Sequence, residues 1–467
     1  MLAVFAGCDD SEGESTETTT AASSVETTAP ATEYTSDTEI FATFEDMKAN
    51  ASLYKALAPC TRSTEGYYEK GDGGAATYSI VTKKPDGVFE KLADGLWACL
   101  VTEENVVPQQ FGAYGDGKRN DHTAIMRAAE YAVANGVKLE LPEADYFTLS
   151  SVVFENIEVI SDNAKISYNG VAANTPTVEL KNNVKIYGTL NLYLHDPKTS
   201  WTAERCAMLF GDYGSGVGAH NCYVESLVIT GGMPGCNAVV MVGETSDITI
   251  DSIIIPNGTK YARGVCMHWG NGDDHKTVAG WSPELGEAGY SHAPDADPMT
   301  FVHDIKLGTV NVTGLKPWGL EDNDISAVAL CAVYNVTIDE IIVNDSLHAA
   351  HITGADLGFE YASDEVKAVG GQKNIYIKKI TGTKLRSMGL YIPGYPWYLP
   401  EKSVNTEIKV DELYLEAASS NTNSSGVYCN KVAKAEFGRV TLKGFSTAIS
   451  KIECEDKVTV GTLTELD

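Results

Sequence analysis

A strand pattern that recurs along the chain constrains the fold more than any other feature. Each copy begins with a polar residue followed by alternating β-branched residues, and the copies lie at 247–255, 335–343, 374–380 and 407–413. The polar starts at Asn335, Asn374 and Glu407 are 39 and 33 residues apart, a period typical of solenoid proteins. Each unit can bury its apolar face only by stacking on a neighbour, so we expect an all-β repeat body.

A second kind of strand lies between these copies and aligns on a small first residue at Gly264, Ala349, Gly389 and Gly426. Side chains alternate along a strand. The alternation places one set in the core: Val265, Met267, Ala350, Ile352, Leu390, Ile392, Val427 and Cys429. It places a polar and aromatic set outside: Cys266, His268, His351, Thr353, Tyr391, Tyr428 and Asn430. Such a row suits an extended sugar chain, because aromatic faces pack on pyranose rings and polar groups bind hydroxyls.

A glycine-rich turn and an amphipathic helix precede the repeats. The turn occupies residues 111–117, Asn120 or Asp121 can cap the helix, and Gly136 ends it. The predicted buried face of the helix consists of Ala124, Ile125, Ala128, Ala129, Ala132 and Val133. Residues 139–142 and 146–149 are then predicted to form the first strands.

This part of the chain resembles the N-terminal signature of the pectate-lyase-like superfamily, which includes polygalacturonase-related hydrolases, polysaccharide lyases and phage tailspike depolymerases. The residues that carry the resemblance are 111–117, 120–125, 141, 142 and 146, with 66–68 and 71–74 upstream. The resemblance implies a right-handed parallel β-helix (solenoid) with an N-terminal capping helix and a small β-rich N-terminal module. It identifies the fold far more strongly than the reaction. His122 departs from the family pattern, which usually has a second Asp there.

Composition divides the chain into four parts. Residues 1–8 end in Phe-Ala-Gly-Cys, which resembles a bacterial lipoprotein signal with Cys8 as the lipidated residue, although the apolar stretch before it is short. Residues 9–40 predict a disordered, acidic, Thr- and Ser-rich tether. Residues 41–107 predict the small module and residues 108–467 the β-helix. We therefore expect an extracellular protein held at the bacterial cell surface, with the membrane as a partner through its lipid.

Charge and cysteine usage narrow the partners. The net charge of −29 argues against nucleic acid, because phosphates would be repelled. Cys60 and Cys99 flank the small module and could form a disulfide. Cysteines inside apolar strand patterns, such as Cys266 and Cys331, are expected to behave as small buried hydrophobic residues. No Cys-x-x-Cys pair occurs, so no structural zinc site is predicted.

Histidines and acids gather between residues 264 and 395, where six of the 9 histidines lie between 268 and 351. The candidate catalytic residues are His268, Asp273, Asp274, Asp322, Asp324, His351, Asp356 and Tyr391. A carboxylate pair from this set would hydrolyse a glycosidic bond, with the two histidines orienting the substrate. Alternatively, a His, Tyr, Lys or Arg would abstract the proton alpha to a uronate carboxylate, as in a polysaccharide lyase. The 272–274 stretch resembles the paired-Asp motif of polygalacturonases, but the flanking family motifs are absent.

Further candidates would bind the sugar without reacting. They are Trp269, Trp318, Lys316, Tyr395, Trp397 and Tyr428. No cofactor is expected, with calcium as an option at Asp273, Asp274, Asp295 and Asp297. The leading prediction is a glycoside hydrolase acting on an extended polysaccharide, which can include uronates. The alternatives are a polysaccharide lyase and a non-catalytic surface adhesin, and the adhesin needs only the aromatic row. A phage-type depolymerase would predict a trimer and fits poorly with a lipoprotein start.

Overall fold

The computed structural model describes residues 39–93, 95–102, 104–172, 175–197, 205–212, 217–267, 302–315, 325–331, 333–353, 372–393, 406–419, 421 and 424–466. The predicted lipidation site Cys8 and the predicted tether up to residue 38 lie outside these ranges. Residues 39–467 group into one compact unit. Among the described helices, none combines the length and the apolar character that a membrane crossing requires.

The N-terminal module is a 5-stranded sheet in the order β1-β2-β3-β5-β4, packed against short helices. Its strands are β1 (Glu39–Phe41), β2 (Cys60–Thr64), β3 (Ala76–Val81), β4 (Glu90–Ala93) and β5 (Leu96–Leu100). The helices are α1 (Phe44–Ala49), α2 (Ala51–Tyr54) and the 3-10 turn η1 (Lys55–Leu57). Phe44 is buried and stacks on Tyr67, with ring centroids 5.0 Å apart. The module therefore has an apolar core of its own.

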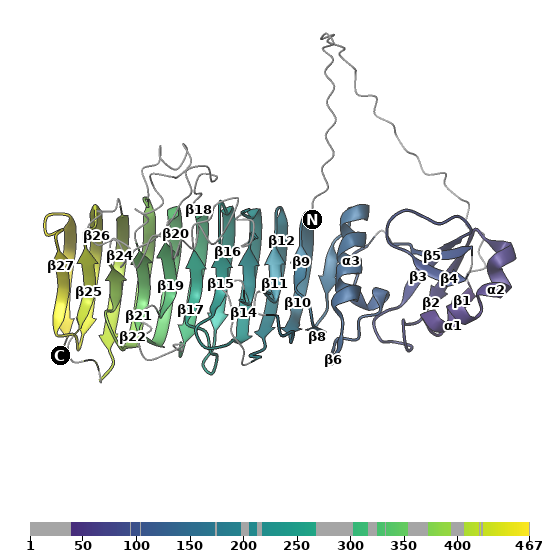
Figure 1. Ribbon diagram of the computed structural model, residues 1–467, viewed down its shortest axis with the longest axis horizontal. Helices are drawn as coiled ribbons and strands as arrows, with labels where there is room; N and C mark the ends of the chain where they lie inside the picture. The colour runs from purple at the N-terminus through teal and green to yellow at the C-terminus, as the bar shows by residue number, and fades with distance from the viewer. Residues whose placement is uncertain are drawn as a thin grey trace, which may run out of the picture. The chain divides into compact units, whose positions relative to one another are not determined.

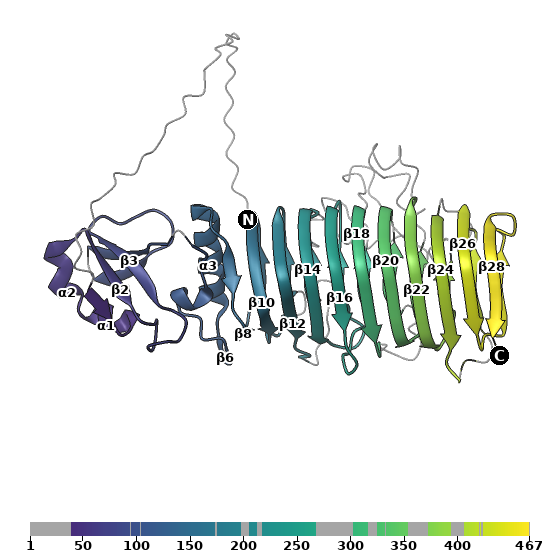
Figure 2. The ribbon, with the colours of Figure 1, turned by 180° about the vertical axis from the view of Figure 1, so that it is seen from behind.

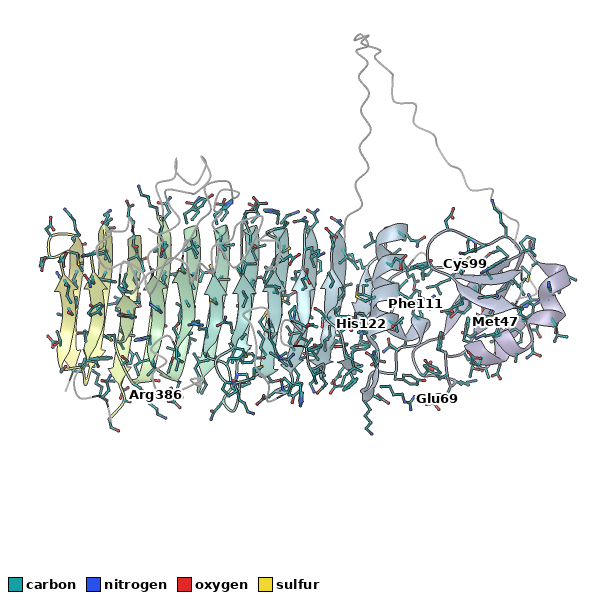
Figure 3. All side chains as sticks on the ribbon, in the orientation of Figure 1. Met47, Glu69, Cys99, Phe111, His122 and Arg386 are labelled. Carbon is teal, nitrogen blue, oxygen red and sulfur yellow. The ribbon has the colours of Figure 1, made fainter. Side chains whose placement is uncertain are left out.

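The predicted capping helix is α3 (His122–Asn135), which follows the 3-10 turn η2 (Pro108–Phe111) and β6 (Asp116–Asn120). Asp121 occupies the N-cap position, but its carboxylate instead accepts the N–H groups of Tyr114 (2.7 Å) and Gly115 (3.1 Å) in the glycine-rich turn. The Asp therefore fixes the turn to the start of the helix. The ring of His122, labelled in Figure 3, reaches the carbonyl oxygen of Ser151 at 2.9 Å.

The buried face of α3 differs from the predicted one at its end. Ile125 is fully buried, whereas Val133 is 46% exposed, so the prediction for Val133 was wrong. Tyr131 is buried instead, and its hydroxyl donates to the carbonyl oxygen of Leu100 at 3.0 Å. The helix therefore packs against the N-terminal module as well as against the repeats.

Residues after α3 form a right-handed parallel β-helix of two long sheets, which confirms the predicted fold. Figure 2 brings forward the strands of the 13-stranded sheet, and every strand pair in it is parallel. It contains β6, β7 (Leu139–Leu141), β8 (Asp145–Thr148), β10 (Ile157–Tyr168), β12 (Val184–Leu194), β14 (His220–Gly231), β16 (Ser246–Ile255), β18 (Val302–Thr313), β20 (Val333–Ser346), β22 (Ile375–Leu385), β24 (Glu407–Ala417), β26 (Lys434–Lys443) and β28 (Val458–Leu466).

The shorter strands of each coil form the 10-stranded sheet, which faces the viewer in Figure 1. Its members are β9 (Val152–Phe154), β11 (Val178–Leu180), β13 (Met208–Phe210), β15 (Asn237–Met241), β17 (Arg263–Met267), β19 (Ser326–Cys331), β21 (His348–Thr353), β23 (Leu390–Ile392), β25 (Ser425–Asn430) and β27 (Thr447–Ile452). The predicted inward residues of the second kind of strand are all buried. One hydrophobic core therefore runs between the two sheets.

The polar residue at the start of seven long strands has a left-handed backbone conformation. The φ angle is between 53° and 58° at Asn156, Asn183, Asn221, Asp247, Asp304, Asn335 and Asn374, whereas Glu407 at the start of β24 has no positive φ. Asn and Asp tolerate this left-handed conformation better than other side-chain-bearing residues, which explains the recurring polar start. The amides also bond along the helix axis, as where Asn374 Nδ2 donates to Asn335 Oδ1 at 2.9 Å.

The small first residues of the short strands have a steric cause. A Cβ atom at Gly264 would lie 2.5 Å from the carbonyl oxygen of Ala327 in the next coil, and one at Gly389 would lie 2.6 Å from that of Gly426. Ala349 at the same position is buried against the core. The chain approaches its neighbouring coil too closely there for a larger side chain.

The predicted disulfide between Cys60 and Cys99 is wrong. Strand β3 lies between β2 and β5, with Cys60 opposite Ile80 and Cys99 opposite Ser79. Neighbouring residues of a strand point to opposite faces, so the two thiols are on different faces of the sheet (Cys99 is labelled in Figure 3). Most cysteines of the β-helix are buried as predicted, Cys266 among them, and Cys222, Cys236, Cys429 and Cys454 belong to the core. The prediction was wrong for Cys331, which is half-buried.

Candidate functional site

The predicted polar row is present on the outer face of the 10-stranded sheet. His351 on β21 pairs in register with Tyr391 on β23, which pairs with Tyr428 on β25. The ring centroids of His351 and Tyr391 are 4.8 Å apart, and those of Tyr391 and Tyr428 are 5.3 Å apart. All three side chains are half-buried. We call His351, Tyr391 and Tyr428 the aromatic row.

Two neighbours hold the aromatic row in place. Asn430, predicted to face outwards, is largely buried, and its Nδ2 donates to the Tyr428 hydroxyl at 3.3 Å. The buried ring of His348 stacks on Tyr391 with centroids 5.0 Å apart. Nδ1 of His348 lies 2.6 Å from the carbonyl oxygen of Met388. Because a carbonyl oxygen only accepts, Nδ1 is the protonated nitrogen.

The row is shorter than the sequence alignment predicts. Strand β19 lies between β17 and β21, so Cys266 pairs with Ala329 and only then with His351. Cys266 is therefore two coils, or about 10 Å, from His351. Cys266 is also buried, like Ala329, as expected for a small hydrophobic residue, so it points outwards but adds no exposed polar group to the row.

The outer face of the 10-stranded sheet changes character along the helix. Towards the N-terminal end the same outward positions carry apolar residues, with Leu209 and Val240 almost fully buried in a second small cluster. Glu179 on β11 occupies the equivalent outward position next to Leu209. Burial raises the pKa of the Glu179 carboxyl above its usual value. Five coils, or about 24 Å, separate Glu179 from His351, so these two groups do not form one site.

Most other predicted site residues lie outside the described ranges. The candidate catalytic residues outside the described ranges are His268, Asp273, Asp274, Asp322, Asp324 and Asp356. The same holds for the binding candidates Trp269, Trp318, Lys316, Tyr395 and Trp397, and for the calcium candidates Asp295 and Asp297. Across the described ranges, no three His, Cys, Asp or Glu side chains gather into a metal-binding group.

A second polar surface was not predicted from the sequence. It is a groove of about 570 Å³ on the outer face of the 13-stranded sheet, at the beginnings of β18, β20, β22, β24 and β26. Its lining includes Asn335, Asn374 and Glu407, the polar residues that start the repeated units. The sequence pattern therefore contained these residues, but it identified them only as the starts of repeated strands and not as part of a binding surface.

Comparison with known proteins gives distant structural neighbours. No protein-family model and no curated protein matches the sequence. The surface adhesin PfbA of Streptococcus pneumoniae has 9% identity over 77% of this chain and 91% of its own, with a TM-score of 0.41. The Acinetobacter phage vb_AbaP_AS12 gp42 tailspike has 10% identity over 91% and 75%, with a TM-score of 0.44. Pantoea stewartii WceF, a glycan biofilm modifying enzyme with a tailspike-like parallel β-helix fold, has 10% identity over 89% and 48%, with a TM-score of 0.35.

Proposed function

We propose that this chain is a cell-surface polysaccharide-degrading enzyme of the pectate-lyase-like superfamily that holds its glycan on the aromatic row. The observation that carries the proposal is the register of His351, Tyr391 and Tyr428 on three successive coils. The rings repeat at the coil spacing of about 4.8 Å, so they form a continuous platform along the helix axis. Aromatic faces pack on the apolar faces of pyranose rings, while the imidazole and phenol groups bind hydroxyls.

Two chemistries fit this location. Hydrolysis, our leading prediction, needs two carboxylates across the bound glycan, and the acids proposed for that role are Asp273, Asp274, Asp322, Asp324 and Asp356. Elimination needs a base that removes the proton alpha to a uronate carboxylate. The imidazole of His351 beside the phenol of Tyr391 favours elimination as the second candidate, because both groups can transfer protons.

The products of a glycan panel discriminate these chemistries. We expect the full chain to shorten at least one plant, host or bacterial polysaccharide. New reducing ends without ultraviolet absorbance would indicate hydrolysis, and an absorbing unsaturated uronate would indicate elimination. Binding without any product would contradict an enzyme and support a surface adhesin.

Variants locate the site. His351→Ala and Tyr391→Phe remove the proton-transferring groups, so under elimination both should lower kcat by about 10²-fold or more. Under hydrolysis Tyr391→Phe should keep kcat, because the ring platform remains. Tyr187→Phe, on β12 of the other sheet, is the matched control and should leave both glycan binding and kcat unchanged. A normal enzyme after replacement of both His351 and Tyr391 by Ala would contradict this location.

The proposal includes anchoring through a lipid on Cys8. Cys8→Ser should move the protein from the membrane fraction to the soluble fraction of an expressing bacterium. An unchanged distribution with no incorporation of labelled palmitate would contradict the anchor and leave the glycan site unaffected.

A further inference from the structure

The groove on the 13-stranded sheet has the length and layout of a binding surface for a chain-like ligand. It crosses five successive coils, which at a spacing of about 4.8 Å gives a length of about 19 Å. Its axis follows the stack of coils, as does the aromatic row, but the two surfaces belong to different sheets. Figure 2 shows the long strands whose starts form the groove.

A ladder of side-chain hydrogen bonds from successive coils lines the groove. Asn374 Nδ2 donates to Asn335 Oδ1 at 2.9 Å, and Asn335 Nδ2 donates to Asp304 Oδ1 at 3.0 Å. Each amide nitrogen carries two N–H groups, and the ladder uses one of them. Within the described part of the chain, the second N–H of Asn335 and of Asn374 has no protein partner. These donors are therefore preorganised for hydroxyl groups of a ligand.

An aromatic side chain in a fixed orientation stands beside the ladder. Tyr376 lines the groove between Thr337 and Lys409 of the neighbouring coils. Its hydroxyl donates to Asp411 in the next coil, and this hydrogen bond raises the pKa of Tyr376. The Lys409 ammonium lies 5.1 Å from the ring centroid. An aromatic ring in a fixed orientation beside hydrogen-bond donors suits the binding of a sugar, which has both apolar faces and hydroxyl groups.

The charges of the groove select against a polyanion. Lys434 pairs with Glu436 at 2.8 Å, and Lys409 pairs with Asp411 at 3.1 Å. Glu407 lies 3.7 Å from Lys373. The lining carries three carboxylates, Asp304, Glu407 and Glu436, against the two ammonium groups of Lys409 and Lys434, so a uronate chain would meet an excess of negative charge. A neutral polyhydroxylated chain meets charged donors and acceptors without like-charge repulsion.

We propose that this groove is a second glycan-binding site, which binds a neutral oligosaccharide lying parallel to the helix axis. The inference rests on the proposed function in taking a glycan as the ligand, but it does not need catalysis or the aromatic row. Two sites on different sheets would let the protein hold a polysaccharide while another segment occupies the aromatic row.

The test is calorimetric binding of defined oligosaccharides to the full chain. The probes are neutral fragments of β-glucan, xylan, mannan and galactan, with oligogalacturonates as the charged comparison. Asn374→Gly removes the amide and keeps a residue that tolerates positive φ, and Tyr376→Ala removes the ring. Each change should weaken binding of a neutral fragment about tenfold and leave oligogalacturonate binding unchanged.

Two matched variants control for folding. Asn183→Gly removes the same kind of ladder amide outside the groove, and Tyr414→Ala removes an outward tyrosine of β24 that does not line it. Both should bind the neutral fragments like the wild type. Groove variants with wild-type affinity for every neutral fragment would overturn this inference alone. A wild-type chain that binds no oligosaccharide would overturn the proposed function and the groove together, while loss only in Tyr391→Ala would leave the aromatic row as the single site.

Discussion

At the scale of single residues, the turns between the two sheets depend on side chains that tolerate a positive φ. Asn183 shows both roles of such a residue. Its φ is 58°, its Nδ2 donates to Asn156 Oδ1 at 2.8 Å, and its Oδ1 accepts from Asn221 Nδ2 at 2.9 Å. The backbone conformation favours Asn over most residues, and the two side-chain hydrogen bonds of Asn183 connect three coils.

Substitutions at Asn183 should separate these two contributions. Asn183→Gly removes both side-chain hydrogen bonds, but glycine still adopts the positive φ. We expect this change to lower the free energy of unfolding by about 0.5–1 kcal/mol, because the hydrogen bonds are exposed. Asn183→Ala adds strain of about 1 kcal/mol. Asn163, with φ 53° in β10, is the control, because Asn163→Gly relieves the same conformation without removing a ladder bond. Urea unfolding that ranks Asn163→Gly as the most destabilising change would contradict this account.

A second residue-scale prediction concerns the carboxylate of Asp72. Burial alone would raise its pKa, but the N–H groups of Tyr67, Tyr68, Glu69 and Gly74 bond to the charged form at 2.7–3.1 Å and together lower the pKa. A lowered folded-state pKa gives stability above the unfolded value of about 3.9, and this stability is lost as pH falls through the folded value.

Asp72→Asn should therefore lower the free energy of unfolding by about 1–2 kcal/mol at neutral pH. The difference from the wild type should shrink below about pH 4. Asp86→Asn, in an exposed turn of the same module, is the control and should have little effect. Unfolding curves that show a difference growing as the pH falls would contradict the proposed role of Asp72.

Alternation along strands was enough to predict the aromatic row. His351, Tyr391 and Tyr428 each follow a small residue and one buried residue, so their outward direction could be read from the sequence. His348 could not be read in this way. The alternation is interrupted directly after His348, since Ala349 and Ala350 are both buried.

At the scale of elements, the order of strands depends on more than local pattern. Strand β19 was missed as a member of the second kind of strand because its sequence, Ser326–Cys331, has no polar outward residue after its start. The register of the N-terminal module was equally hidden, because the pairing of β2, β3 and β5 depends on contacts distant in sequence. The alternation of side chains therefore predicted the repeated strands of the β-helix better than it predicted β19 or the strand pairing of the N-terminal module.

The capping helix gives an element-scale prediction. Ile125 of α3 is fully buried in the core, so Ile125→Ala should lower the free energy of unfolding by about 2–4 kcal/mol. Val133→Ala, on the same helix but 46% exposed, should change it by less than about 0.5 kcal/mol. Equal effects of the two variants in chemical unfolding would contradict the packing of α3 as a cap.

At the scale of the whole molecule, two independent features of the sequence predicted the same fold. The signature at 111–125 implied the capping helix and the right-handed β-helix, and the repeat period implied that successive strand units stack on one another. Function was less accessible, because a β-helix supports both enzymes and binding proteins. The groove on the 13-stranded sheet is an example. The residues of its hydrogen-bond ladder have a structural role that follows from the sequence, whereas a role in ligand binding is suggested only by their arrangement in the folded chain.

The central claim is that a glycan lies along the aromatic row. Its most direct test is an experimental structure of the full chain with an oligosaccharide found in the glycan panel. The account predicts sugar rings against Tyr391 and Tyr428, with a hydroxyl within hydrogen-bond distance of His351. An oligosaccharide bound only at other surfaces, with His351, Tyr391 and Tyr428 uncovered, would contradict it.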